Sequence, residues 1–445
     1  MSRPPGTAGT LAEPPSPLLR QAAYTMLIRA LQLAVGGIAG VAIARTLQPD
    51  GRGAFAVAVT IGTTTYVLGH LAIEQSQSSL WSEPANRRSV AANSVLLGPL
   101  TGTAAALAAA LVLVVTGPER GAATGGVGPV LALCMVPFAV TMLYATNVMV
   151  LRGRLDVVGR AQLVGTAGQC GLLLALAGTG HLTVAGAVLV WAAPQVLPLV
   201  VLLSRIGVRV SDADAGLARR ALGRGIRFHL GSASLYLLYN ADVFLLNAMS
   251  TSAAVGIYAV AVTLAELCRV FTNSVAQVAL ADQMSSDGTW AIDVTCRATR
   301  LITLVALVPA TALTVAATLL VPRVYGAAFT GSVAPLLWLT PGVLALGATR
   351  PIAAYLVRLG RPLVNSAMVA GCLALNLALN LVLIRRYGAV GCAAASSVAY
   401  GVLAVLQVTW FRRATGTRPG ELLPGRDEVR YLAVGLVRLV RSAAR

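Results

Sequence analysis

Long apolar segments, separated only by short polar connections, constrain this chain more than any other feature. About twelve of them follow one another between residues 24 and 411, and each is long enough to cross a bilayer, which takes about 20 mostly apolar residues. Hydrophobic residues make up 57% of the 445 residues and charged residues only 11%, a balance that water-soluble domains of this length do not have. The sequence therefore predicts an all-α, polytopic membrane protein with about 12 transmembrane helices.

The distribution of the arginines predicts the orientation of the chain. All 34 basic residues are arginine, and the formal net charge of +18 first suggests a nucleic-acid partner. However, 25 arginines fall on one side of the predicted membrane, 6 on the other and 3 within the spans. Because basic residues are retained on the cytoplasmic side, we expect a protein of the cytoplasmic membrane, with both termini in the cytoplasm and no nucleic-acid partner.

The predicted spans divide the chain into two groups of six. Residues 24–205 form an N-terminal six-helix lobe and residues 227–411 a C-terminal six-helix lobe. Residues 206–226, rich in arginine, form a cytoplasmic linker. Residues 1–23 are expected to be a disordered cytoplasmic tail, and residues 412–445 a basic amphipathic one.

A weak internal repeat relates the two lobes. Residues 53–60 (GAFAVAVT) recur 203 positions later as residues 256–263 (GIYAVAVT), and both copies begin the second span of their lobe. An even number of spans gives both lobes the same orientation in the membrane. They are then expected to be related by a pseudo-two-fold axis along the membrane normal, with a cavity between them, which is a geometry suited to alternating access.

Ionisable residues within the spans mark the candidate substrate pathway, because charge inside lipid is costly and usually faces a cavity. On the seventh span, Ser232, Tyr239 and Asp242 follow at intervals of 7 and 3 and share one stripe, with Asn240 at its flank. We interpret this stripe as a cavity-facing site. The alternative is that Asp242 is buried for packing by hydrogen bonds from a neighbouring span.

The eighth span carries a second polar face. Glu266, Arg269 and Asn273 follow at intervals of 3 and 4, and the first two can pair within the helix, which lowers the cost of both charges. A functional pair and a self-neutralised structural pair are both consistent with this spacing. The two polar stripes belong to adjacent spans, so we expect them to face each other.

Two further arginines lie just inside the predicted cytoplasmic boundary, Arg29 in the first span and Arg350 in the tenth. They either extend to the lipid headgroups or face the cavity, where arginine would offer paired donors to the phosphate oxygens of a substrate. His70, Glu74 and His229 also lie near this boundary, and we expect them to serve the interface.

Short motifs indicate a family. Residues 47–56 (LQPDGRGAFA), Asp242 followed by residues 254–261 (AVGIYAVA), and residues 375–394 (LNLALNLVLIRRYGAVGCAA) resemble the polysaccharide flippases of the multidrug/oligosaccharidyl-lipid/polysaccharide exporter superfamily. The resemblance implies a V-shaped pair of lobes that moves a polyprenyl-pyrophosphate-linked oligosaccharide across the bilayer. It also implies glycosyltransferases and a polymerase of the same pathway as partners.

Other functions make different demands on the sequence. A cation-coupled exporter of small organic molecules with the same fold would depend on Asp242, which is also our candidate for coupling to Na⁺ or H⁺; the membrane potential is a further source of energy. A membrane-embedded glycan polymerase would need a large outer loop with catalytic arginine or histidine, and residues 116–126 offer only Glu119 and Arg120. No nucleophile, phosphate-loop or metal motif appears, so we expect neither enzymatic activity nor a cofactor.

Overall fold

The computed structural model describes residues 17–116, 126–285, 288–425 and 428, and these residues form helices joined by short turns. Nine stretches of this described part are helical, long and apolar enough to cross a membrane. The prediction of an all-α polytopic membrane protein is therefore confirmed. The predicted basic tail after residue 428, and the first sixteen residues, lie outside the described part of the chain.

The first half of the molecule, called here the N half, contains six helices. They are α1 (Pro17–Gly69), α2 (Ile73–Trp81), α3 (Arg87–Thr116), α4 (Val127–Leu151), α5 (Leu155–Gly178) and α6 (Val184–Ile206). The first helix begins at Pro17, inside the range predicted to be a disordered tail, and proline is favourable in the first turn of a helix. It reverses direction at Gln48, whose φ of 56° is not helical, so α1 holds the first two predicted spans.

The second half, called the C half, also contains six helices. They are α7 (Ala215–Met249), α8 (Ser252–Ser285), α9 (Gly288–Val324), α10 (Val333–Ala348), α11 (Arg350–Arg358) and α12 (Pro362–Thr415). The last helix reverses at Gly388, where φ is 53°, and holds the last two predicted spans. The described residues contain nine helical stretches that could cross a membrane. The count of twelve spans and the pseudo-two-fold axis therefore stay predictions.

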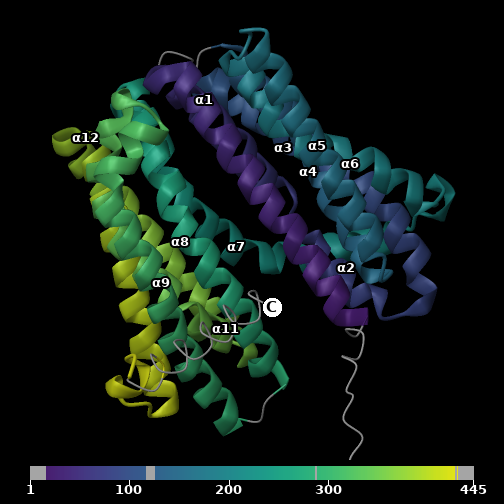
Figure 1. Ribbon diagram of the computed structural model, residues 1–445. Helices are drawn as coiled ribbons and strands as arrows, with labels where there is room; N and C mark the ends of the chain where they lie inside the picture. The colour runs from purple at the N-terminus through teal and green to yellow at the C-terminus, as the bar shows by residue number, and fades with distance from the viewer. Residues whose placement is uncertain (1–16, 117–125, 286–287, 426–427, 429–445) are drawn as a thin grey trace, which may run out of the picture.

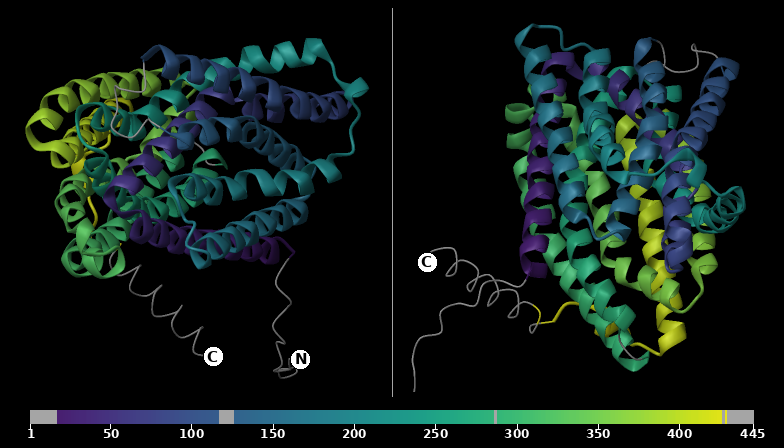
Figure 2. Two further views of the ribbon diagram at one scale, coloured as in Figure 1. Left: turned by 90° about the horizontal axis from the view of Figure 1, so that it is seen from above. Right: turned by 90° about the vertical axis from the view of Figure 1, so that its right-hand side faces the viewer.

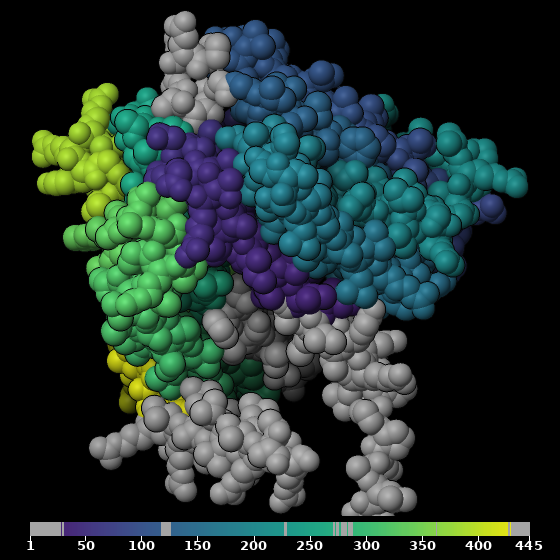
Figure 3. All heavy atoms as spheres, turned by 45° about the horizontal axis from the view of Figure 1, so that its top comes forward, coloured from purple at the N-terminus to yellow at the C-terminus, as the bar shows by residue number. Residues whose placement is uncertain are grey.

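The two halves are inclined to each other like the arms of a V. Figure 1 shows them meeting at the upper end, near the reversal of α1, and diverging toward the lower end. The start of α1 and the end of α12 both lie at this lower end, and the views in Figure 2 agree with that arrangement. In the space-filling view, the first part of α1 lies between the two halves (Figure 3).

The two copies of the internal repeat meet at the apex of the V. A Cβ atom on Gly53 would lie 1.9 Å from the carbonyl oxygen of Ser252, and one on Gly256 would lie 2.0 Å from that of Pro49. The Ser252 hydroxyl also donates a hydrogen bond to the Asp50 carbonyl at 2.8 Å. Each repeat therefore supplies a glycine that lets the backbone just before the other repeat approach closely.

One helix, α7, belongs to both halves. It begins at a cap in which the Asp214 carboxylate accepts from the Leu217 amide at 2.9 Å, and Leu217 and Ala221 are buried in a cluster with Ile73 of the N half. The predicted linker, residues 206–226, is thus helical from residue 215, and its Leu217 and Ala221 pack against the N half.

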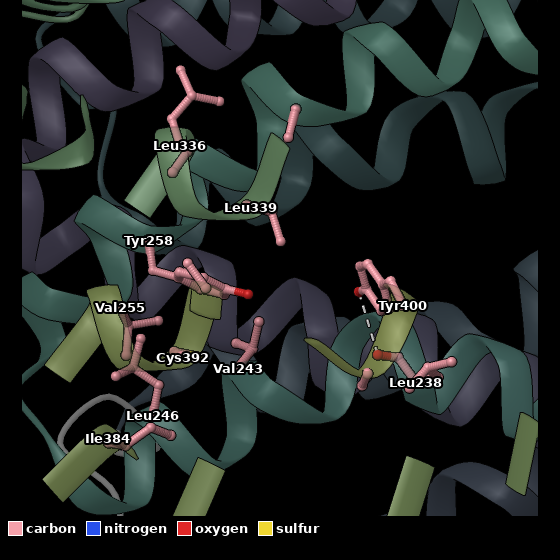
Figure 4. Packing of buried hydrophobic residues seen from close by; sticks show 14 of the residues in the cluster. Leu238, Val243, Leu246, Val255, Tyr258, Leu336, Leu339, Ile384, Cys392 and Tyr400 are labelled. Atoms are coloured by element: carbon pink, nitrogen blue, oxygen red, sulfur yellow. Dashed lines mark hydrogen bonds between the residues drawn. The ribbon is translucent and has the colours of Figure 1, made fainter. Parts of the chain in front are cut away.

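The far part of α7 packs in the interior of the C half. Leu238, Val243 and Leu246 are buried there with Tyr258 of α8 and Tyr400 of α12, as the close view in Figure 4 shows. The Tyr400 hydroxyl donates to the Leu238 carbonyl at 3.4 Å, the dashed line of that figure. This packing places the polar side chains of α7, α8 and α12 next to one another.

Candidate substrate site in the C half

The carboxylate of Asp242 lies in the packed interior of the C half. Its residue is 1% exposed, and one carboxylate oxygen accepts hydrogen bonds from the hydroxyl groups of Tyr258 and Ser396, the latter at 3.0 Å. The other oxygen accepts from the Val243 amide at 2.9 Å. A buried carboxylate needs such donors, so this geometry matches the alternative in which Asp242 is buried for packing. The interpretation of Asp242 as cavity-facing is wrong. Its role in transport stays a prediction.

The hydrogen bonds to Asp242 continue into α12. The Asn376 side chain donates to the Ser396 hydroxyl at 3.2 Å, and Asn380 donates to the Asn376 carbonyl group at 3.0 Å. All three residues are fully buried. Both asparagines belong to residues 375–394, which carry part of the family resemblance. Two asparagines four residues apart on an apolar span were the available signal of a buried polar chain.

A small cavity of about 30 Å³ opens beside this network, between α7, α8, α10, α11 and α12. Tyr239, Glu266, Arg269 and Arg350 lie on its wall, so four of the predicted site residues are brought together. Tyr258 also lines it, and this ring separates Asp242 from the cavity. The expectation that the polar stripes of α7 and α8 face each other is therefore confirmed at Tyr239, Glu266 and Arg269.

A second cavity of about 300 Å³ continues from the first and shares Tyr239 and Arg350 with it. Asn365 and Gln407 of α12 lie on its wall, where Gln407 donates to the Asn365 side-chain oxygen at 2.9 Å. Gln407 is 3% exposed and its own side-chain oxygen has no hydrogen-bond partner among the described residues. Neither residue was singled out from the sequence, because an isolated amide in a span carries little signal.

The two arginines of the cavity differ in their partners. The Arg269 guanidinium contacts the Glu266 carboxylate at 2.5 Å and lies 4.8 Å above the centre of the Tyr239 ring, which in turn meets the Tyr400 ring edge to face at 5.7 Å. Among the described residues, none forms an ion pair or hydrogen bond with Arg350. The wall therefore carries one neutralised and one unpaired guanidinium, so it is net positive.

The remaining predicted site residues lie elsewhere. Ser232 is exposed, and its hydroxyl donates to the His229 carbonyl of its own helix at 2.9 Å. Asn240 donates to the Tyr236 carbonyl at 3.0 Å. Both side chains thus form hydrogen bonds with the backbone of α7, and neither lies on the wall of the cavity. The side chains of Arg29 and Asn273 lie outside the described residues.

Comparison with known proteins places the chain in a family. Residues 42–334 match the family described as "Polysaccharide biosynthesis protein". No curated protein matches the sequence.

Solved structures resemble the whole molecule. A lipid II flippase, MurJ, in an inward closed conformation matches with a TM-score of 0.70 and 12% identity over 91% of this chain and 89% of that one. A multidrug resistance MATE family transporter matches in its inward-facing conformation with a TM-score of 0.64 and 16% identity, over 89% and 94% of the two chains. The outward-facing conformation of such a transporter gives 0.54 and 14%, over 90% and 95%.

At these identities the structural matches show the fold. The family match covers more than half of the sequence, as the resemblance of the short motifs predicted. The chain belongs to the polysaccharide biosynthesis protein family and has the fold of multi-pass membrane flippases and exporters.

Proposed function

We propose that this protein moves a polyprenyl-pyrophosphate-linked oligosaccharide, or a related envelope glycan unit, from the inner to the outer leaflet of the cytoplasmic membrane. The observation that carries this proposal is the unpaired Arg350 on the wall of a cavity that also holds Arg269. A guanidinium offers parallel donors that fit phosphate oxygens. A pyrophosphate would supply the negative charge that this wall lacks.

The rest of the cavity suits the sugar part of such a substrate. The rings of Tyr239 and Tyr400 form an aromatic wall, and the amides of Asn365 and Gln407 offer donors and acceptors for hydroxyl groups. Gln407 still has an unused acceptor. The polyprenyl chain would stay in the bilayer while the polar head crosses, so no covalent change of the substrate is needed and we propose no enzymatic step.

Orientation and conformation are part of the proposal. The excess of arginine on one side supports cytoplasmic termini, and the helices diverge toward the end at which α1 starts and α12 ends. The TM-scores of 0.70 with the inward closed flippase and 0.64 with the inward-facing transporter, against 0.54 with the outward-facing one, support an inward-directed conformation. Glycosyltransferases and a polymerase of the same pathway are the proposed partners.

The test is a leaflet-accessibility assay in proteoliposomes that contain a short-chain polyprenyl-pyrophosphate disaccharide. We expect Arg350→Gln to lower the rate of movement by about 10-fold or more, because a hydrogen bond to a charged group contributes about 1.5–3 kcal/mol. Arg269→Gln should lower it less, since Glu266 already occupies that guanidinium. Arg386→Gln, at an exposed position, is the matched control and should keep the wild-type rate.

A second function is favoured by one observation. The Glu266 side chain is 48% exposed, and a carboxylate on an aromatic cavity wall also suits an organic cation. The same vesicles should therefore be loaded with a panel of cationic drugs. If the drugs move and the glycolipid does not, the protein is a small-molecule exporter and the glycan proposal is wrong.

A further inference from the structure

Another cavity with a basic wall lies in the N half, away from the candidate substrate site. Its volume is about 570 Å³, and it is bounded by the end of α2, the start of α3, the end of α4 and the end of α6. Three arginines lie on its wall, and no carboxylate is among the described residues that line it. The lining residues are Trp81, Arg87, Arg88, Leu151, Arg152 and Ile206, together with residues 207–208. The charge of this wall therefore favours an anion.

Arg87 has the most unused donors of the three arginines. Its one hydrogen bond among the described residues joins Nε to the Trp81 carbonyl oxygen at 3.2 Å. This bond fixes the base of the guanidinium at the edge of the cavity. A guanidinium carries five N–H donors, so the two terminal nitrogens of Arg87 remain for a ligand or for water.

Arg152 is held at the cavity by the end of α6. Its Nη1 donates to the Ile206 carbonyl oxygen at 2.6 Å, which is one of the carbonyl groups that the end of a helix leaves without a partner. Burial and the nearby Arg154 lower the pKa of Arg152. Positive charge is therefore crowded at this position, and a bound anion would offset the repulsion.

Arg88 is shared between the cavity and the connection that leads to α7. Its Nε lies 3.1 Å from a carboxylate oxygen of Asp212, and the same oxygen accepts from the Arg209 amide at 2.9 Å. Asp212 thus neutralises Arg88, and the net positive charge of the wall comes from Arg87 and Arg152. Asparagine at position 212 would release Arg88 and still offer an acceptor to the Arg209 amide.

The rest of the wall is apolar and lies where membrane-spanning helices end. The helical stretches that could cross a membrane include α4 and α6, whose last residues are Leu151 and Ile206, and both residues line the cavity with Trp81. Val150 and Leu203, in the last turns of the same helices, are 45% and 39% exposed. A free phosphate would use only the arginines, whereas a phospholipid would also cover apolar surface.

We propose that this cavity binds the phosphate group of an anionic phospholipid. The guanidinium groups of Arg87 and Arg152 hold its phosphate oxygens through charge-assisted hydrogen bonds, and Trp81 contacts the glycerol and ester part. The lipid comes from the inner leaflet, to which the arginine distribution assigns this end of the helices. The site is separate from the cavity of Arg269 and Arg350 and does not rest on the proposed transport function.

A lipid in this cavity has a structural consequence for the N half. One headgroup contacts the end of α2, the start of α3 and the ends of α4 and α6. Through Arg88 and its ion pair with Asp212 it also reaches the connection that precedes α7. Binding therefore stabilises the packing of these elements against one another, because a ligand that binds only the folded state raises its stability.

Binding is measured by native mass spectrometry of the full-length protein in micelles. The probes are dioleoyl phosphatidylglycerol, dioleoyl phosphatidylcholine and inorganic phosphate. We expect the first phosphatidylglycerol molecule to bind about 10-fold more tightly than phosphatidylcholine, which has the same acyl chains and no net charge. Inorganic phosphate at the same concentration should not displace it. Displacement by inorganic phosphate would identify a site for the free ion and overturn the assignment to a lipid.

Three variants locate the bound lipid. Arg87→Gln should raise the dissociation constant of the first phosphatidylglycerol by about 10-fold, because a hydrogen bond to a charged group is lost. Asp212→Asn should lower that constant, since it releases Arg88, and a damaged fold would not produce such a gain. Arg220→Gln is the matched control, because Arg220 is exposed on α7 and outside the wall, and it should bind as the wild type does.

Thermal unfolding gives an independent readout. Phosphatidylglycerol added to the micelles should raise the melting temperature of the wild type and of Arg220→Gln, and should raise that of Arg87→Gln less. An unchanged dissociation constant in Arg87→Gln would overturn the proposal. Equal losses of affinity in Arg87→Gln and Arg220→Gln would also overturn it, because the lipid would then respond to the net charge of the protein rather than to this cavity.

Discussion

The two halves of the molecule each contain six of the described α-helices, but they bury different polar groups. The C half holds Asp242 in a chain of hydroxyl and amide groups beside a cavity with two arginines. The residue 203 positions earlier, the repeat distance, is Ala39, which is 2% exposed in an apolar cluster of the N half. The buried polar side chains of the N half include Arg52 at the apex and the hydrogen-bonded Gln77 and Ser94 of α2 and α3. Among the described residues, Asp242 of the C half is thus the one carboxylate that is buried.

If the scaffold is shared, equivalent changes at the apex should damage both halves alike. Gly53→Leu and Gly256→Leu each place a side chain within about 2 Å of a backbone carbonyl oxygen, which no rotamer relieves. We expect each to lower the free energy of unfolding by more than about 3 kcal/mol, measured by unfolding in mixed micelles. Gly223, with nothing near its Cβ position, gives the control Gly223→Ala. A large effect at only one of the two glycines would break the equivalence.

The hydrogen-bond network around Asp242 lies in the C half, so its loss should lower the free energy of unfolding through that half alone. Asp242→Ala leaves the Tyr258 and Ser396 hydroxyls without their acceptor and should cost about 3 kcal/mol. Asp242→Asn keeps one acceptor oxygen and should cost about 1 kcal/mol. The same unfolding assay measures both. Equal losses from Ala and Asn would mean that the charge, rather than the hydrogen bonds, holds this site together.

A smaller effect on stability is expected from an ion pair at the surface of the N half. The Arg209 amide donates to Asp212 at 2.9 Å, and Arg88 lies 3.1 Å from the same oxygen; together they lower the pKa of Asp212. A lowered carboxyl pKa stabilises the folded state above the unfolded value of about 3.9. This stabilisation is lost as the pH falls through the lowered pKa.

Asp212→Asn should therefore slightly lower the melting temperature at neutral pH and have no effect at a pH below the lowered pKa, where the wild-type carboxyl is itself protonated. Melting curves of the variant and the wild type recorded across the acidic range measure this difference. A melting temperature that is the same in both proteins at neutral pH would contradict the stabilisation.

The membrane fold was predictable because it depends on patterns along the chain. Apolar segments of bilayer length need no tertiary information, and the repeat at Gly53 and Gly256 marks the place where the structure brings the halves together. Helical spacing also predicted which face of α8 carries Glu266 and Arg269. These are local regularities, and the fold preserves them.

Tertiary placement could not be predicted in the same way. A helical wheel shows that Ser232, Tyr239 and Asp242 share a stripe, but it does not show that α7 passes from one half into the other. Along that single stripe Ser232 is exposed, Tyr239 lines the cavity and Asp242 is buried. The contact between His70 and His229 joins segments about 160 residues apart, a distance at which sequence spacing carries no information.

The double membership of α7 also bears on how the chain could be divided. Its first turns dock on the N half through Leu217 and through two hydrogen bonds between Asn93 and the backbone of Asp214, although the chain connecting α6 to α7 is short. A protein expressed as two fragments, cut between residues 207 and 213, would still carry this docking surface on its second fragment. The two pieces should find each other in the bilayer without a covalent link.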